Sequence, residues 1–340
     1  HDQAGYTKSF NNAADLFREA FSLANDLGIK TATGIEVPLG KDYEIDGGPL
    51  VNGIPQELQK HLQQEYGIDP SSQKATEKLY KGMYQWLLAN DIPVDYFWLW
   101  TTEVWMPWGG GSRDSAKVSA VKQSMRAAKK VYNNMSEKPF SQFATGGWLL
   151  GAENKPNVFA DVFPDLSVPF SSMSAPFGKI GDYPGTVEWT DDIPSERVKW
   201  PFTWFEFDYG LEQPQFQVYR VLHDARDAYD EGDMNGLIAE FWRTKMLAPM
   251  FAAYKNALWD YAPTGEKISV DLPSTDKERK SKIEDIYLDW AVHEFGPGAP
   301  AKQIASDLAR FDKSKAKKFH DVVNFAEGAD SIYSQGYITG

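Results

Sequence analysis

Two glutamates that follow aromatic, strand-like runs are the residues best suited to chemistry. Glu103 stands in WLWTTEVWMPW, and Glu206 stands in WPFTWFEFDYG with Asp208 two residues later. Hydrolysis of a glycosidic bond needs two carboxyl groups: one protonates the leaving oxygen, and the other attacks the anomeric carbon or activates water. Because desolvation by aromatic neighbours raises a carboxyl pKa, Glu103 suits the general acid. Glu206 or Asp208 would supply the second carboxylate, and the alternative is that these acids only bind hydroxyl groups or loop backbone.

Three further polar residues end or follow strand-like segments. Glu36 lies in TGIEVP, and Glu240 and Arg243 lie in LIAEFWRTKMLAP. An acid in an apolar strand needs a partner, so Glu240 and Arg243 could form a structural ion pair. Arg243 could equally hold a carboxylate or sulfate group of a substrate through a bidentate contact. We expect all three, together with Asp208, to bind or orient a sugar.

The chain is rich in aromatic side chains. Aromatic residues make up 14% of the 340 residues and include 12 Trp. Trp presents a large apolar face with a polar N–H at its edge, and such faces can stack on sugar rings. We expect stacking walls from four tryptophans near strand ends, Trp105, Trp108, Trp148 and Trp204. The alternative is that these tryptophans belong to a Trp-rich core.

Charge and residue usage exclude several classes of function. The 35 Lys and Arg against 48 Asp and Glu give a net charge of −13, which argues against nucleic acid and anionic membranes as partners. The absence of Cys excludes disulfides, thiolate catalysis and Cys-ligated metals. The five His show no ligand spacing, and no apolar run is long enough to span a membrane. We therefore expect a carbohydrate partner, no metal and no cofactor.

Strand-like and helix-like segments alternate along the chain. The alternation predicts strands at Lys30–Val37, Val94–Thr101, Phe140–Gly146, Ser167–Ser172, Trp200–Phe207 and Gly236–Phe241. Apolar residues at helical spacing predict helices at 11–28, 74–90, 115–132, 156–162, 214–230 and 245–259, then helices alone at 276–294, 299–311 and 313–326. Residues 38–73, rich in Gly, Pro and Asp, read as a long loop. The strongly apolar Val94–Thr101 is typical of a strand buried on both faces.

This alternation is typical of an α/β fold with a parallel sheet. No strand is followed by a Gly-rich phosphate loop, which favours a (β/α)8 TIM-like barrel over a doubly wound sheet. Six strands do not close such a barrel, and the chain opens with a helix. We therefore expect the first two strands to lie upstream, with a six-strand sheet as the alternative. The predicted domains are a barrel over residues 1–264 and a C-terminal helical extension over residues 265–340.

Four segments together resemble the barrel domain of bacterial polysaccharide-degrading glycoside hydrolases: DYFWLWTTEVW, FATGGWLLG, KWPFTWFEFD and GLIAEFWRTKMLAP. The resemblance is to clan A, in which an acid/base Glu follows strand four and a nucleophile Glu follows strand seven. With two strands upstream, Val94–Thr101 is strand four and Trp200–Phe207 is strand seven. On this numbering the resemblance implies Glu103 as acid/base, Glu206 as nucleophile and a retaining mechanism. We expect a poly- or oligosaccharide as substrate, such as an algal galactan or an acidic plant or algal glycan, and a secreted or periplasmic location. Thr102 stands where clan A commonly has Asn, which leaves an inverting mechanism open.

Three other functions fit parts of the same pattern. A non-catalytic sugar-binding protein would use the aromatic residues without the carboxylate pair. A polysaccharide lyase on a barrel would need a Tyr, Lys or His base and a group such as Arg243 to neutralise a uronate. A scaffolding module would lack an acidic, aromatic pocket, and fold alone decides between none of these functions.

Overall fold

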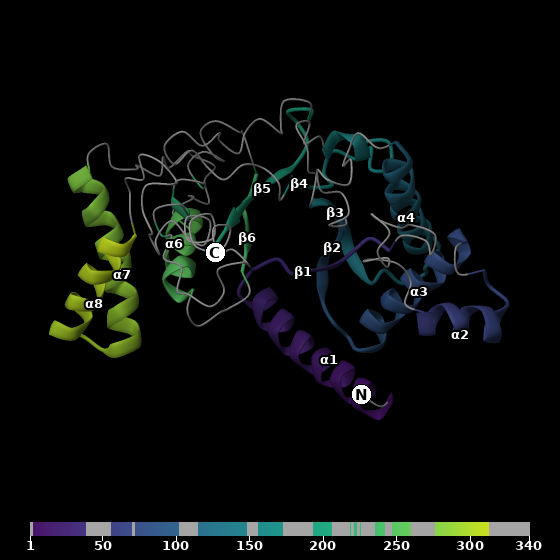
Figure 1. Cartoon of the computed structure of the whole chain (residues 1–340), viewed down its shortest axis with the longest axis horizontal. Coiled ribbons are helices and arrows are strands. Elements are labelled where there is room, and N and C mark those ends of the chain that lie inside the picture. The colour runs from purple at the N-terminus through teal and green to yellow at the C-terminus, as the bar shows by residue number, and fades with distance from the viewer. Residues whose placement is uncertain are drawn as a thin grey trace, which may run out of the picture. The chain divides into compact units, whose positions relative to one another are not determined.

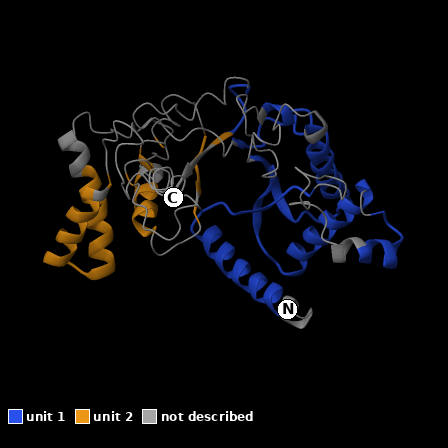
Figure 2. Cartoon of the chain, viewed as in Figure 1, with its two compact units in different colours: residues 1–174, 192–198 blue, residues 175–191, 199–340 orange. Residues whose placement is uncertain are grey.

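The computed structural model describes residues 3–38, 56–69, 72–101, 115–147, 156–172, 193–205, 218, 221–222, 225, 235–241, 247–259 and 276–312. The chain divides into two compact units, which Figure 2 shows in blue and orange. The first unit comprises residues 1–174 and 192–198, and the second comprises residues 175–191 and 199–340. The predicted domain boundary after residue 264 falls outside the described residues and stays a prediction.

The first unit contains four parallel strands in chain order. These are β1 (Ala32–Glu36), β2 (Val94–Thr101), β3 (Phe140–Gly147) and β4 (Phe170–Ser172). Each strand pairs in parallel with the next one along the chain. The helical elements of this unit are α1 (Gln3–Asp26), α2 (Gln56–Tyr66), α3 (Gln73–Ala89), α4 (Ser115–Asn134) and the 3-10 turn η4 (Pro156–Phe159). Parallel strands alternating with helices are confirmed.

Helices α3 and α4 form because their apolar residues recur at intervals of three or four. Helix α3 begins after Ser72, whose hydroxyl accepts a hydrogen bond from the Ala75 N–H at 3.3 Å, the usual N-cap arrangement. Its buried Tyr84 packs edge-on against Phe97 of β2, with ring centroids 5.1 Å apart. From α4, Met125 is fully buried and lies 3.8 Å from the Thr145 hydroxyl of β3. These contacts hold both helices against one face of the sheet.

Strand β2 differs from its prediction in how its two faces are covered. Phe97 and Leu99 are buried on the face that meets the helices, whereas Trp98 and Trp100 are only partly buried. Because successive strand residues point to opposite faces, the two tryptophans lie on the face away from α3 and α4. The prediction that both faces are buried is therefore wrong for the Trp face.

A buried arginine fastens the chain on either side of β4. Arg197 is 1% exposed, and its guanidinium donates hydrogen bonds to the carbonyl oxygens of Asp165 (2.9 Å), Val168 (3.2 Å) and Phe163 (2.9 Å). The same guanidinium lies over the Phe170 ring, 4.0 Å from its centroid. These contacts offset part of the cost of burying a charge and hold residues 163–170 beside residues 197–198.

The second unit contains the parallel pair β5 (Lys199–Trp204) and β6 (Ile238–Glu240). Helix α6 (Ala248–Trp259) follows and corresponds to the predicted helix at 245–259. Helices α7 (Asp276–Phe295) and α8 (Ala299–Phe311) confirm the C-terminal helices expected at 276–294 and 299–311. Helices α7 and α8 lie side by side (Figure 1). The buried hydroxyl of Tyr287 in α7 donates to the Asp312 carboxylate beyond α8 at 3.0 Å, which fixes this helix pair.

The largest departure from the predicted elements is α2. It occupies Gln56–Tyr66, within the segment 38–73 that reads as a loop from the sequence. Several strands also differ at their ends: β4 begins three residues later than predicted, and β5 ends at Trp204 rather than at Phe207. The predicted helix at 313–326 lies outside the described residues.

Candidate functional site

Only one of the ten predicted site residues, Glu36, has a described side chain. The backbone of Trp204 and Glu240 is described at the ends of β5 and β6. The other seven lie outside the described residues: Glu103, Trp105, Trp108, Trp148, Glu206, Asp208 and Arg243. Their assignment to a site stays a prediction.

Glu36 is the last residue of β1, at the carboxyl edge of the sheet. It lies opposite Trp100 in the parallel register, and the next residue, Val37, donates its N–H to the Trp100 carbonyl at 2.8 Å. Strand β2 ends one residue later, at Thr101, and Glu103 follows two residues beyond. The carboxyl edge of a parallel sheet is where α/β proteins place their ligands, so Glu36 occupies a suitable position.

Beside Glu36, Trp98 and Trp100 form an indole pair on the face of β2 that the helices leave uncovered. Their ring centroids lie 5.0 Å apart with an angle of 35° between the ring planes. The register neighbours of Trp98 are Gly34 and Ala144, and those of Trp100 are Glu36 and Gly146. Small neighbours leave room for two large side chains. Indole faces next to a carboxylate can take a ligand with both C–H and hydroxyl surfaces, as a sugar has.

Trp98 and Trp100 are not among the site residues predicted from the sequence. The alternation in VDYFWLWT places both tryptophans on one face of a strand, and that signal was available. A strongly apolar run, however, is typical of a strand buried on both faces, which predicts core positions for both tryptophans.

The carboxyl edge of β3 is fixed by short polar contacts and a close backbone approach. The buried Thr145 hydroxyl donates to the Leu99 carbonyl at 3.0 Å, and the Ser171 hydroxyl donates to the Thr145 carbonyl at 3.2 Å. Gly146 has φ 126°, and a Cβ at this position would lie 2.0 Å from the Ser171 carbonyl oxygen. Only glycine fits there. These contacts make the edge beside Trp100 a rigid base.

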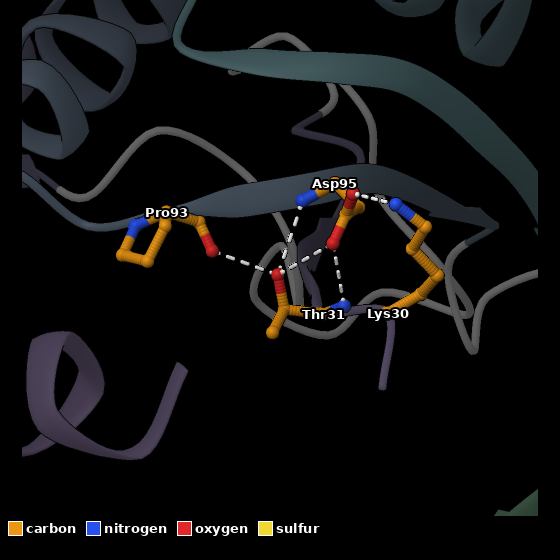
Figure 3. A network of polar contacts seen from close by, with 4 residues as sticks. All are labelled: Lys30, Thr31, Pro93 and Asp95. Atoms are coloured by element: carbon orange, nitrogen blue, oxygen red, sulfur yellow. Dashed lines mark hydrogen bonds and ion pairs between the residues drawn. The ribbon is translucent and has the colours of Figure 1, made fainter. Parts of the chain in front are cut away.

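The opposite, amino end of β1 and β2 carries a separate polar network (Figure 3). The Asp95 carboxylate accepts hydrogen bonds from the Lys30 ammonium at 2.8 Å and from the Thr31 N–H at 3.0 Å. The Thr31 hydroxyl donates to the Pro93 carbonyl at 2.7 Å and accepts from the Asp95 N–H at 3.1 Å. This network joins the two strands at the end away from Glu36, so its role is structural.

The Asp95 network also shifts two pKa values. Burial alone would raise the pKa of Asp95, but hydrogen bonds from Lys30 and Thr31 and the charge of Lys30 outweigh it and lower the pKa. The hydrogen bond to Asp95 and the Asp95 charge raise the pKa of Lys30. Both groups are therefore ionised at neutral pH, and the pair holds a charge-assisted contact.

Two further properties bear on ligands and location. Within the described residues, no three acidic or histidine side chains gather closely enough to hold a metal ion. None of the described helices combines the length and apolar character needed to cross a membrane.

Comparison with known proteins identifies no family. No protein-family model matches the chain, and neither a curated protein nor a solved structure matches it. The structure shows an α/β protein with parallel strands and C-terminal helices, and the resemblance to glycoside hydrolases remains an interpretation of its sequence motifs.

Proposed function

We propose that the chain is a carbohydrate-active hydrolase that cleaves a poly- or oligosaccharide with two carboxyl groups. The observation that carries this proposal is the indole pair of Trp98 and Trp100 beside Glu36. This group lies at the carboxyl edge of parallel strands and directly precedes the segment that holds Glu103. Aromatic faces bind a sugar ring, and a carboxyl group two residues beyond the strand supplies an acid.

In this proposal Glu103 is the general acid/base and Glu206 is the nucleophile of a retaining mechanism. The reaction needs no metal and no cofactor, because both proton transfer and nucleophilic attack come from carboxyl groups. The residues proposed to bind or stack on the sugar are Glu36, Trp105, Trp108, Trp148, Trp204, Asp208, Glu240 and Arg243. Trp98 and Trp100 join this set because both side chains are only partly buried and Trp100 lies opposite Glu36 in the strand register. The proposal includes a secreted or periplasmic location.

The order of the strands supports a (β/α)8 barrel as the scaffold. Strands β1 to β4 follow chain order without reversal. In the common doubly wound folds the strand order reverses part-way across the sheet. No more than three strands that are successive in the chain then lie side by side. Four in sequence therefore favour the singly wound arrangement of a barrel, and the proposed barrel places Trp98 and Trp100 toward its interior.

A non-catalytic carbohydrate-binding protein is the second candidate, because the same indole pair favours it. Such a protein needs the aromatic surface and Glu36 but has no use for Glu103 as an acid. The two functions differ in one measurable consequence: only the hydrolase releases new reducing ends.

The test is reducing-sugar release from a panel of plant and algal polysaccharides by the full chain. We expect Glu103→Gln and Glu206→Gln each to lower the rate at least about a hundredfold, because each removes an acid/base or nucleophilic group. The matched control is Glu137→Gln, an exposed acid in the turn before β3, which should retain the wild-type rate. Affinity electrophoresis on the same glycans measures binding separately.

The outcomes separate the two candidates. Hydrolysis by the wild type that persists in Glu103→Gln would remove Glu103 from the mechanism. Binding to one glycan without any release of reducing ends would establish the binding protein instead. In either case Trp100→Ala should weaken glycan binding about tenfold, because roughly 1.4 kcal/mol of stacking is lost.

A further inference from the structure

An apolar cavity of about 580 Å³ lies in the first unit, away from the indole pair. It is bounded by α1, α2, α3 and β1, on the helix-covered side of the sheet. Its walls include Phe10 and Phe17 from α1, Leu62 from α2, and Met83 and Trp86 from α3. A volume of this size falls in the range of about 300–1,000 Å³ typical of small-molecule sites.

The cavity exists because α1 touches α3 at few points. Phe10 meets Trp86 edge-on with ring centroids 6.1 Å apart, and Arg18 donates to the Asn90 carbonyl at 3.0 Å. Between these contacts α3 presents Gly82, and nothing lies within 4 Å of the place where a Cβ would stand. The missing side chain in the middle of α3 therefore leaves a hollow with an apolar lining.

One cation at this cavity has an aromatic ring as its partner. The Lys78 ammonium lies over the Tyr66 ring, 3.0 Å from the centroid, and both residues line the cavity. Among the described residues, no carboxylate pairs with Lys78, although the chain has 48 acidic residues. His61 lines the cavity beside Tyr66 as well. An apolar hollow with a cation at its wall is complementary to an apolar body that ends in an anionic group.

We propose that this cavity binds a small aliphatic carboxylate, with the hydrocarbon between α1 and α3 and the carboxylate on Lys78. The aliphatic part covers Phe10, Met83 and Trp86, which removes apolar surface from water. The carboxylate gains a charge-assisted contact with the Lys78 ammonium. This site is separate from the proposed sugar chemistry and does not depend on it.

The probes are octanoate and octan-1-ol, which share a chain length and differ in charge. Isothermal titration calorimetry on the full chain should give octanoate binding tighter than about 1 mM. Bound octanoate should also raise the thermal midpoint of unfolding in a concentration-dependent way. Lys78→Met should weaken octanoate binding about tenfold and leave octan-1-ol binding unchanged.

A second variant tests the location. Gly82→Leu adds a side chain at a position that lines the cavity and where a Cβ meets nothing within 4 Å, so both probes should bind at least about tenfold more weakly. Gly82→Ala is the matched control, because it gives the same gain in helix propensity with little added volume.

Three results would overturn the proposal. Octanoate binding that Gly82→Leu leaves intact would place the ligand elsewhere. Equal loss of both probes in Lys78→Met would remove the anionic group from the recognition. Failure of both probes to bind, together with a dimer in solution that Gly82→Leu dissociates, would assign the cavity to a second copy of the chain.

Discussion

Removal of the Asp95 carboxylate should destabilise the first unit and change how its stability depends on pH. The Asp95 side chain is 15% exposed, and it accepts the N–H of Thr31, a residue that is 4% exposed. In Asp95→Ala this N–H loses its acceptor, and an unsatisfied buried donor costs about 1–3 kcal/mol. Asp95→Asn keeps an oxygen for Thr31 and should cost less. The contact with Lys30 adds little, because that side chain is 72% exposed and exposed ion pairs contribute little to stability.

The sign of the pH effect follows from the lowered pKa of Asp95. A carboxyl group with a lower pKa in the folded than in the unfolded chain stabilises the fold above its unfolded pKa of about 3.9. This contribution is lost as the pH falls through the folded pKa. The free energy of unfolding of the wild type should therefore exceed that of Asp95→Ala at pH 7, and part of the difference should disappear below about pH 4.

Thermal unfolding followed by calorimetry between pH 3 and pH 7 measures both effects. A loss of 1–3 kcal/mol corresponds to a midpoint lower by about 2–12 °C at neutral pH for a unit of this size. Asp26→Asn, at the exposed last residue of α1, is the control for loss of one negative charge and should change the midpoint little. Equal midpoints for the wild type and Asp95→Ala at pH 7 would refute the reasoning, and so would a difference that stays constant down to pH 3.

Other substitutions should act through packing and backbone geometry. Gly34→Ala places a Cβ 2.2 Å from the Trp98 carbonyl oxygen. It should therefore lower the free energy of unfolding, measured by urea titration, by at least about 1 kcal/mol. A variant as stable as the wild type would contradict the close approach of β1 to β2. Gly82→Ala, with open space around the new Cβ, should instead raise the free energy of unfolding by about 0.5–1 kcal/mol, and a loss would show that α3 is not helical there. Arg197→Met leaves three carbonyl groups without their donor and should lower the free energy of unfolding by at least about 2 kcal/mol. Arg197→Lys should recover only part of this stability, because a lysine lacks the planar guanidinium fork. Full recovery by Arg197→Lys would show that only the positive charge matters.

The sequence predicted the elements whose side chains repeat regularly. The β2 bounds agree with the prediction because Val94–Thr101 is a strongly apolar, aromatic run that begins after Pro93. Helix α3 was predicted because Leu79, Met83, Trp86 and Leu87 recur at helical spacing. Helix α4 was predicted from the same spacing of residues that include Val121 and Met125. In these segments the local pattern and the tertiary packing agree.

Helix α2 shows where such patterns fail. Its sequence QELQKHLQQEY contains good helix formers, but Leu62 is the one buried residue among its described side chains. A helix that buries so little has a weak apolar period. The Gly and Pro residues that precede it therefore led to the prediction of a loop over the whole segment. Propensity alone would have detected it.

The candidate site was predictable in part. The place of Glu36 at a strand end follows from the pattern of TGIEV, and the structure agrees. The pairing of Glu36 with Trp100 depends on the register between β1 and β2, which nothing in either strand alone specifies. The partial exposure of Trp98 and Trp100 depends on which face the helices cover, and that is a property of the whole unit.

Gly146 has a consequence for evolution. Its positive φ and the closeness of the Ser171 carbonyl restrict the backbone itself, so the restriction holds whatever ligand the neighbouring loops select. Aromatic and acidic residues around the strand ends can diverge with the ligand, whereas a side chain at position 146 would break the pairing of β3 with β4. Distant descendants of this fold should therefore share this glycine after their binding residues have ceased to be recognisable.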